Sequence, residues 1–77
     1  MRYFFHMRSH LGDEPDDEGL EFDTLDIAVD EAEETAREMV AERVMHQERI
    51  DGTRFEIADE HGNVLATVPF REVLNLD

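Results

Sequence analysis

The chain contains no cysteine, no tryptophan and no lysine, so all seven of its cations are arginine. Without cysteine the protein forms no disulfide and offers no thiolate to zinc, to an iron–sulfur cluster or to a substrate. The single serine, Ser9, has no Gly-x-Ser-x-Gly segment around it, and the four scattered glycines form no phosphate-binding loop. No pair of carboxylates stands out as an acid–base pair. We therefore expect no enzyme, with a small enzyme as a remote alternative.

Positive charge is scarce, because 21 Asp and Glu face seven Arg and give a formal net charge of −14. Nucleic acids and anionic membrane surfaces are bound mainly through Lys and Arg, so we expect the protein to bind neither. No stretch approaches the roughly 20 apolar residues of a membrane span. The apolar stretch at the start, Tyr3–Phe5, is too short for a signal peptide. We expect a cytoplasmic protein.

Length and hydrophobic content predict one small folded domain over residues 1–77. A typical domain takes about 100–200 residues, so 77 residues allow only one. Leu, Ile, Val and Phe together make up 20 of the 77 residues. This share exceeds the ~20% below which disorder is the usual interpretation.

Two periodicities predict the secondary structure. Apolar residues recur every three or four positions over 24–48, which predicts one long helix with Asp23 or Thr24 as its N-cap. A short C-terminal helix is expected over 70–75. Alternating apolar and polar residues predict four strands, near 2–8, 20–22, 53–59 and 64–68. The expected fold class is therefore α+β, with a small antiparallel sheet covered on one face by the long helix.

Two loops complete this expected fold. Residues 9–19 carry two Gly, one Pro and five acidic residues, which is typical of a loop, and we expect an acidic mobile loop there. Asp59–Asn63 is expected to close a hairpin, with Gly62 in the left-handed position of its turn.

The long helix is expected to extend beyond the sheet. A helix of about 24 residues spans about 36 Å, whereas a six-residue strand spans only about 20 Å. Val44 and Met45, near the helix end, are therefore candidates for exposed apolar surface. We expect a monomer or a weak homodimer through the C-terminal half of the helix.

The negative charge is concentrated in one part of the chain. Residues 13–34 contain twelve of the acidic residues and no Arg, while the remaining nine acidic residues share the rest of the chain with all seven Arg. The simplest interpretation is a solvated surface that keeps a small protein soluble. A second is an acidic face that binds a basic protein partner. Its candidate contact residues are Asp13, Glu14, Asp16, Asp17, Glu18, Asp30 and Glu34.

The same acidic loop supports an alternative function, a divalent-cation-binding protein that uses residues 13–18. Hard cations take clustered carboxylates, but this loop lacks the residue spacing of an EF-hand. The histidines at 6, 10, 46 and 61 add no second metal site. His6 and His10 are four residues apart, but this spacing falls on a strand that runs into a loop. We assign no metal ligand, cofactor or catalytic residue.

Several segments match one pattern. The chain opens with Arg-Tyr-Phe-Phe at Arg2–Phe5, has an acidic turn at Asp17–Glu21, and follows its long helix with Phe-x-Ile-x-Asp-Glu-x-Gly at Phe55–Gly62. It then carries Val-Pro-Phe-Arg at Val68–Arg71. In this combination it resembles a family of small bacterial domains of unknown function, common in soil and plant-associated bacteria. The resemblance implies a stand-alone cytoplasmic domain and favours an interaction or regulatory role over an enzyme.

Overall fold

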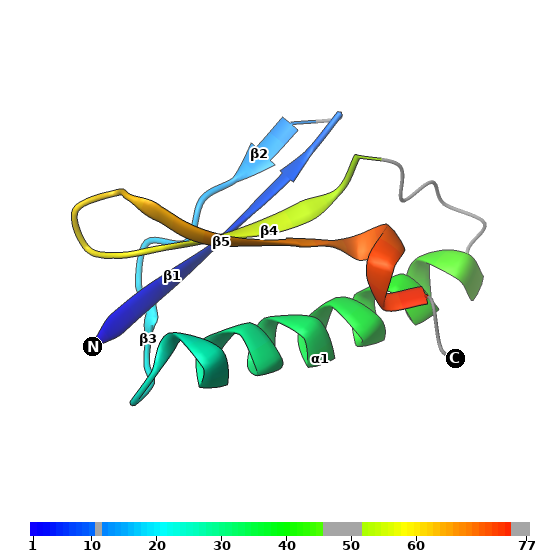
Figure 1. The fold of residues 1–77 in the computed structure, drawn as a ribbon. Coiled ribbons are helices and arrows are strands. Elements are labelled where there is room, and N and C mark those ends of the chain that lie inside the picture. Colours follow the sequence, from blue (N-terminus) through cyan, green and yellow to red (C-terminus); the bar gives the residue numbers. More distant parts are fainter. Residues whose placement is uncertain (11, 46–51, 75–77) are drawn as a thin grey trace.

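The fold has two layers, an antiparallel sheet of five strands and one long helix that crosses one face of the sheet (Figure 1). The structure, a computed structural model, describes residues 1–10, 12–45 and 52–74. In chain order its elements are β1 (Arg2–Ser9), β2 (Gly12–Glu14), β3 (Leu20–Glu21), α1 (Leu25–Met45), β4 (Arg54–Ala58), β5 (Val64–Pro69) and the 3-10 helix η1 (Phe70–Leu74). The predicted α+β fold is confirmed.

The strands and helix predicted from periodicity lie within a few residues of those observed, and β2 is an addition. This short strand lies inside the segment 9–19 that we expected to be a loop. Its pairing with β1 sets Arg8 opposite Asp13, and the two side chains form an ion pair with N···O 3.1 Å. Residues 46–48, the end of the predicted helix, lie outside the described residues, as do the side chains of Val44 and Met45. The expected homodimer through this end therefore stays a prediction.

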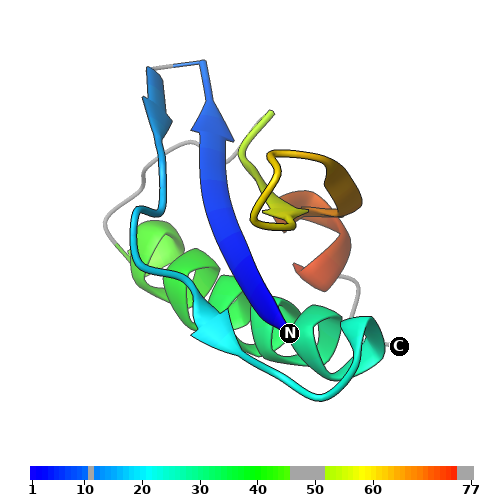
Figure 2. The same cartoon turned by 90° about the vertical axis from the view of Figure 1, so that its left-hand side faces the viewer.

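The sheet has the strand order β2-β1-β4-β5, and β3 also pairs with β1. β2 pairs with Met7–Ser9 and β3 pairs with Arg2 and Tyr3, whereas β4 pairs with β1 over Phe4–Arg8. β2 and β3 therefore follow each other along the edge of β1 that β4 leaves open, as Figure 2 shows. Together they form one edge strand that is interrupted between residues 15 and 19.

A row of small side chains joins the helix to the sheet. Ala28, Ala32 and Ala36 recur every four residues along one side of α1, and all three are fully buried. Because alanine side chains are short, the helix backbone lies close to the sheet, and the aromatic rings fill the remaining space. Phe55 of β4 and Phe70 of η1 pack with their ring centroids 5.1 Å apart. Phe70 is held at the end of β5 by its N–H, which donates to the carbonyl of Thr53 at 2.9 Å.

Local hydrogen bonds fix the two ends that the sequence marked. Thr24 is the N-cap of α1, because its Oγ1 accepts the N–H of Ile27 at 3.2 Å. In the β4–β5 hairpin, Gly62 has φ +86° and donates its N–H to the carbonyl of Asp59. The Asp59 carboxylate accepts the N–H groups of Asn63 and His61, and the bond from Asn63 is the main reason that the pKa of Asp59 is lowered. Both assignments confirm the sequence-based expectation.

Gly19 is the last residue between β2 and β3, and two structural constraints require glycine at this position. Its φ is +70°, in the left-handed region, and a Cβ there would lie 2.9 Å from the carbonyl oxygen of Tyr3 and 2.9 Å from a ring carbon of Phe4. The backbone oxygen cannot move aside without disturbing β1. The residue therefore needs both the conformational freedom and the small size of glycine.

We predict that Gly19→Ala lowers the free energy of unfolding by roughly 2–5 kcal/mol, from backbone strain and overpacking together. Gly62→Ala is the matched control, because φ is also positive there but nothing lies within 4 Å of the added Cβ. It should cost only about 1–2 kcal/mol. Urea unfolding followed by circular dichroism measures both losses, and equal losses would show that the close approach to β1 is unimportant.

Candidate functional site

The structure divides the seven candidate contact residues between two places. Five follow the interrupted edge strand and two lie on the helix. Asp13 and Glu14 belong to β2, Asp16 to Glu18 belong to the turn that leads to β3, and Asp30 and Glu34 are one helical turn apart on α1. The two groups therefore come from different layers of the fold.

Asp16 is the centre of a hydrogen-bond cluster. One carboxylate oxygen, Oδ2, accepts the backbone N–H of Phe5 at 3.1 Å. The other, Oδ1, accepts the N–H groups of Glu18 and Gly19, each at 3.1 Å. The N–H of Asp16 itself donates to Nδ1 of His6 at 3.0 Å. We call this set of four bonds the Asp16 clamp.

The Asp16 clamp repairs the interruption in the edge strand. Backbone groups alternate in direction along β1, so the N–H of Phe5 points to the same side as the residues that pair with β2 and β3. On this side no strand lies opposite Phe5, and a buried N–H without an acceptor costs about 1–3 kcal/mol, so even a partly buried one needs a partner. The Asp16 carboxylate takes the place of the missing strand carbonyl, and it fixes the turn to β1.

The environment of Asp16 keeps it ionised. Partial burial acts to raise the pKa of its carboxyl, but the hydrogen bonds from Gly19, Phe5 and Glu18 favour the anion. The N–H donors prevail, and the pKa of Asp16 lies below its ordinary value. Both oxygens are already bound to backbone groups. Asp16 is therefore a structural residue, although the sequence made it a candidate contact residue.

Asp13 is also engaged within the molecule, through an ion-pair network on the sheet face opposite α1. Arg8 contacts Asp13 of β2 at 3.1 Å and Glu56 of β4 at 2.8 Å, so three adjacent strands are linked. The hydrogen bond from Arg8 lowers the pKa of Glu56, and the same bond raises the pKa of Arg8. Glu56 also lies 3.6 Å from Arg54. This network balances the charges on that face.

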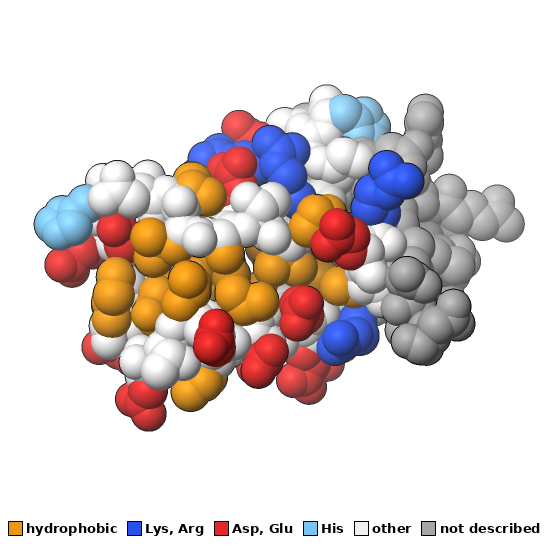
Figure 3. Space-filling model, viewed as in Figure 1, with side chains coloured by type: hydrophobic (Ala, Val, Ile, Leu, Met, Phe, Trp, Pro, Cys, Tyr) orange, Lys and Arg blue, Asp and Glu red, His pale blue; other side chains and the backbone are white. Residues whose placement is uncertain are grey.

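The carboxylates of α1 are not balanced in this way. Asp30 and Glu34 are exposed, and neither forms an ion pair with any residue that the structure describes. The same holds for Asp26, Glu31 and Glu38 of the helix, while Glu33 is half-buried and likewise forms no ion pair with a described residue. Arg37 is the one cation of α1 whose side chain is described, and it is exposed as well. Figure 3 shows carboxylates along the helix, below a band of apolar surface.

The described part of the chain contains neither a metal-binding cluster nor a membrane-spanning helix. Within residues 1–10, 12–45 and 52–74, no group of three or more His, Asp or Glu side chains is placed to hold a metal ion. His6 stacks against Phe4 with ring centroids 6.4 Å apart, and its Nδ1 accepts the N–H of Asp16. No helix in the described part of the chain is both long and apolar enough to cross a membrane.

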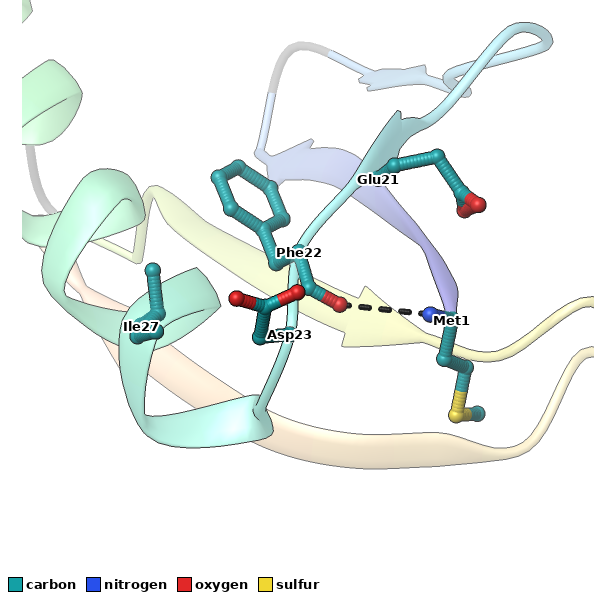
Figure 4. A pocket seen from close by; sticks show the side chains of 5 residues that line it. All are labelled: Met1, Glu21, Phe22, Asp23 and Ile27. Atoms are coloured by element: carbon teal, nitrogen blue, oxygen red, sulfur yellow. Dashed lines mark hydrogen bonds between the residues drawn. The ribbon is translucent and has the colours of Figure 1, made fainter.

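A shallow hollow of about 290 Å³ lies where β3 leads into α1, lined by Met1, Glu21, Phe22, Asp23 and Ile27. In Figure 4 the carboxylates of Glu21 and Asp23 do not point toward each other, and the amino group of Met1 donates to the carbonyl of Phe22 at 3.2 Å. The hollow therefore brings together no nucleophile and base. It is a surface feature of the β3–α1 junction and contains no assembled catalytic group.

Sequence reasoning missed the role of Asp16, although one signal was present. Asp16 precedes Gly19 by three residues, and an Asp whose side chain accepts N–H groups two and three positions ahead is a common turn device. The bond to Phe5 has no such signal, because it joins residues that are eleven positions apart. The ion pair of Arg8 with Glu56 joins residues that are 48 positions apart, so no local sequence pattern predicts it either.

Comparison with known proteins gives one match. The sequence model of a family described as Domain of unknown function (DUF6894) matches residues 2–71. No curated protein and no solved structure matches the chain. The sequence resemblance to a small domain of unknown function is thereby confirmed.

We predict that Asp16→Asn lowers the free energy of unfolding by about 1–3 kcal/mol, because the amide nitrogen of Asn cannot accept an N–H. Asp17→Asn is the matched control: it removes the same charge from the next position, where the side chain is exposed and makes no described hydrogen bond. Chemical denaturation of the two variants measures the difference. A loss in Asp17→Asn as large as in Asp16→Asn would contradict the clamp.

The stabilisation by Asp16 should depend on pH. Its folded pKa is lowered, so the unfolded chain takes up this proton first as the pH falls. The contribution is complete above the unfolded pKa of about 3.9, and it is lost as the pH falls through the folded pKa. The difference in unfolding free energy between wild type and Asp16→Asn should therefore be largest near neutral pH and shrink below about pH 4. A difference that does not change with pH would contradict this assignment.

Proposed function

The chain belongs to the DUF6894 family of domains of unknown function, and we propose that it is a non-enzymatic interaction or regulatory module that binds a basic segment of another protein. One observation carries this proposal: the carboxylates of α1 have no partners among the described residues. Among the described residues, the network of ion pairs lies on the opposite face of the sheet, where Arg8 and Arg54 bind Glu56.

The structure narrows the contact residues that the sequence suggested. Asp16 is occupied by backbone N–H groups, and Asp13 is paired with Arg8. Asp30 and Glu34 are exposed and unpaired among the described residues, so they are the strongest candidates. Glu14 at the end of β2 and Asp17 and Glu18 in the turn before β3 are exposed too and form a second group.

Like charges that are kept close together raise the energy of the free protein, and a cationic partner relieves this repulsion. Such a surface attracts a basic partner over a distance of about one Debye length, which is about 10 Å at 0.1 M salt and about 3 Å at 1 M. Exposed pairs contribute little affinity one by one, so we expect binding that is fast, moderate in strength and sensitive to salt.

Affinity capture from the native cell lysate tests the proposal. We expect an Arg- or Lys-rich protein to be retained at about 0.05 M salt and released at about 0.5 M, because salt screens exposed charges. Once the partner is identified, the double variant Asp30→Asn/Glu34→Gln should bind it several-fold more weakly. The matched control is Glu60→Gln/Glu72→Gln, which removes the same charge from exposed positions outside α1.

Two results would contradict the proposal. One is a partner that is retained equally at both salt concentrations, since binding would then not depend on exposed charge. The other is an equal loss of binding in the helix variant and in the control, since the effect would then reflect net charge and not the surface of α1.

A further inference from the structure

The two edges of the sheet differ in a way that points to a docking mode. The edge formed by β2 and β3 consists of two very short strands, and the Asp16 clamp covers the gap between them. Short, charged and covered edges are how proteins prevent unwanted strand pairing. The other edge, β5, has the sequence Val-Leu-Ala-Thr-Val-Pro and carries no charge. Among the described strands, β5 pairs with β4 only.

The direction of the backbone groups shows which N–H and carbonyl groups of β5 are exposed at the edge of the sheet. The N–H of Phe70 donates to Thr53, so in the alternating ladder Val68 and Ala66 direct their backbone groups toward β4, opposite Phe55 and Ile57. Thr67 lies between them, and its N–H and carbonyl point outward from the edge of the sheet, in the direction opposite to β4. Pro69 presents its carbonyl on the same side and has no N–H. The register shift lies between Ile57 and Ala58, so the pairing of Ala66–Pro69 with β4 is regular.

Apolar surface lies beside this open edge. Val64 and Leu65 of β5 are 52% and 40% exposed. Figure 3 shows a continuous apolar band between the β4–β5 hairpin and α1. Val29 of α1 is only partly buried against the core. An added strand would cover this surface as well as the backbone groups of Thr67.

The helix adds negative charge along the same side. By helical periodicity Asp26 and Glu33 flank the buried alanine row on the side opposite to Ile27, with one cation, Arg37, a turn after Glu33 on the same side. Ile27 lies beside Phe22 in the hollow next to β3, so Asp26 and Glu33 lie on the side of β5. Figure 3 shows carboxylates along the border of the apolar band.

The negative charge on α1 determines which kind of strand can pair with β5. If two copies paired through β5 around a two-fold axis, their helices would lie on the same face of the joined sheet, with Asp26 and Glu33 of each directed toward the other copy. Like charges would then meet, and each chain already has a net charge of −14. A strand that carries Lys or Arg on its helix side meets opposite charge instead.

We propose, resting on the function proposed above, that β5 accepts an extended basic segment of the partner as an additional antiparallel strand. A residue opposite Thr67 exchanges two backbone hydrogen bonds with it, and the carbonyl of Pro69 accepts a third. Alternate Lys or Arg side chains lie on the helix side, where their aliphatic stems cover Val29 and their cationic groups reach Asp26 and Glu33.

A fluorescent peptide that alternates arginine and threonine is the probe. In an antiparallel strand its threonines lie on the side of Thr67, and their N–H groups face β5. N-methylation of the threonine amides removes these donors, while N-methylation of the arginine amides leaves them and keeps the composition and charge the same. We expect the first change to weaken binding about tenfold or more, and the second to leave binding nearly unchanged.

Two variants of the protein test whether the backbone N–H of Thr67 binds the peptide. Thr67→Pro removes the outward N–H at a position where an edge strand tolerates proline, and Thr67→Val keeps the N–H. Circular dichroism checks that both fold. We expect Thr67→Pro to weaken binding of the unmethylated peptide about tenfold, and Thr67→Val to bind like wild type.

The outcomes separate the two proposals. Equal, salt-sensitive binding of both methylated peptides would overturn strand addition and leave binding of a basic segment intact. No binding of any peptide at low salt would contradict both. Self-association of the protein in sedimentation equilibrium that Thr67→Pro abolishes would also overturn strand addition, because a second copy would then occupy β5.

Discussion

The carboxylate of Asp16 is the interaction on which the shape of the sheet depends. The chain leaves β1 after β2, passes through residues 15–19 and returns as β3, so the middle of β1 has a strand on the β4 side only. By accepting the N–H of Phe5 and two N–H groups of its own turn, Asp16 closes this gap with a side chain. One edge of the sheet is thereby complete, and β5 is left as the open edge.

The elements that follow from local sequence were predictable, and the contacts between distant residues were not. The long helix follows from the repeat of Ala28, Ala32 and Ala36, and the hairpin follows from the turn chemistry around Gly62, because both signals lie within a few residues. β2 was missed, since its three residues, Gly-Asp-Glu, have no apolar alternation and form a strand only because β1 lies beside them.

The same limit applies to the candidate site. The sequence showed that acidic residues are concentrated between positions 13 and 34, but not which of them the fold uses. Asp16 and Asp13 are bound to other parts of the molecule, whereas Asp30 and Glu34 remain exposed on α1. This division separates two environments of one residue type: a carboxylate inside a turn stabilises the fold, and a carboxylate on the helix surface stays exposed to solvent.

Amide hydrogen exchange measured by NMR tests the central claim, that a carboxylate closes one edge of the sheet and that the other is open. The account predicts that the amide of Phe5 is protected although no strand lies on the side to which its N–H points, and that the amide of Thr67 exchanges fast although it lies within a regular strand. Fast exchange at Phe5, or protection at Thr67 in the monomeric free protein, would contradict it.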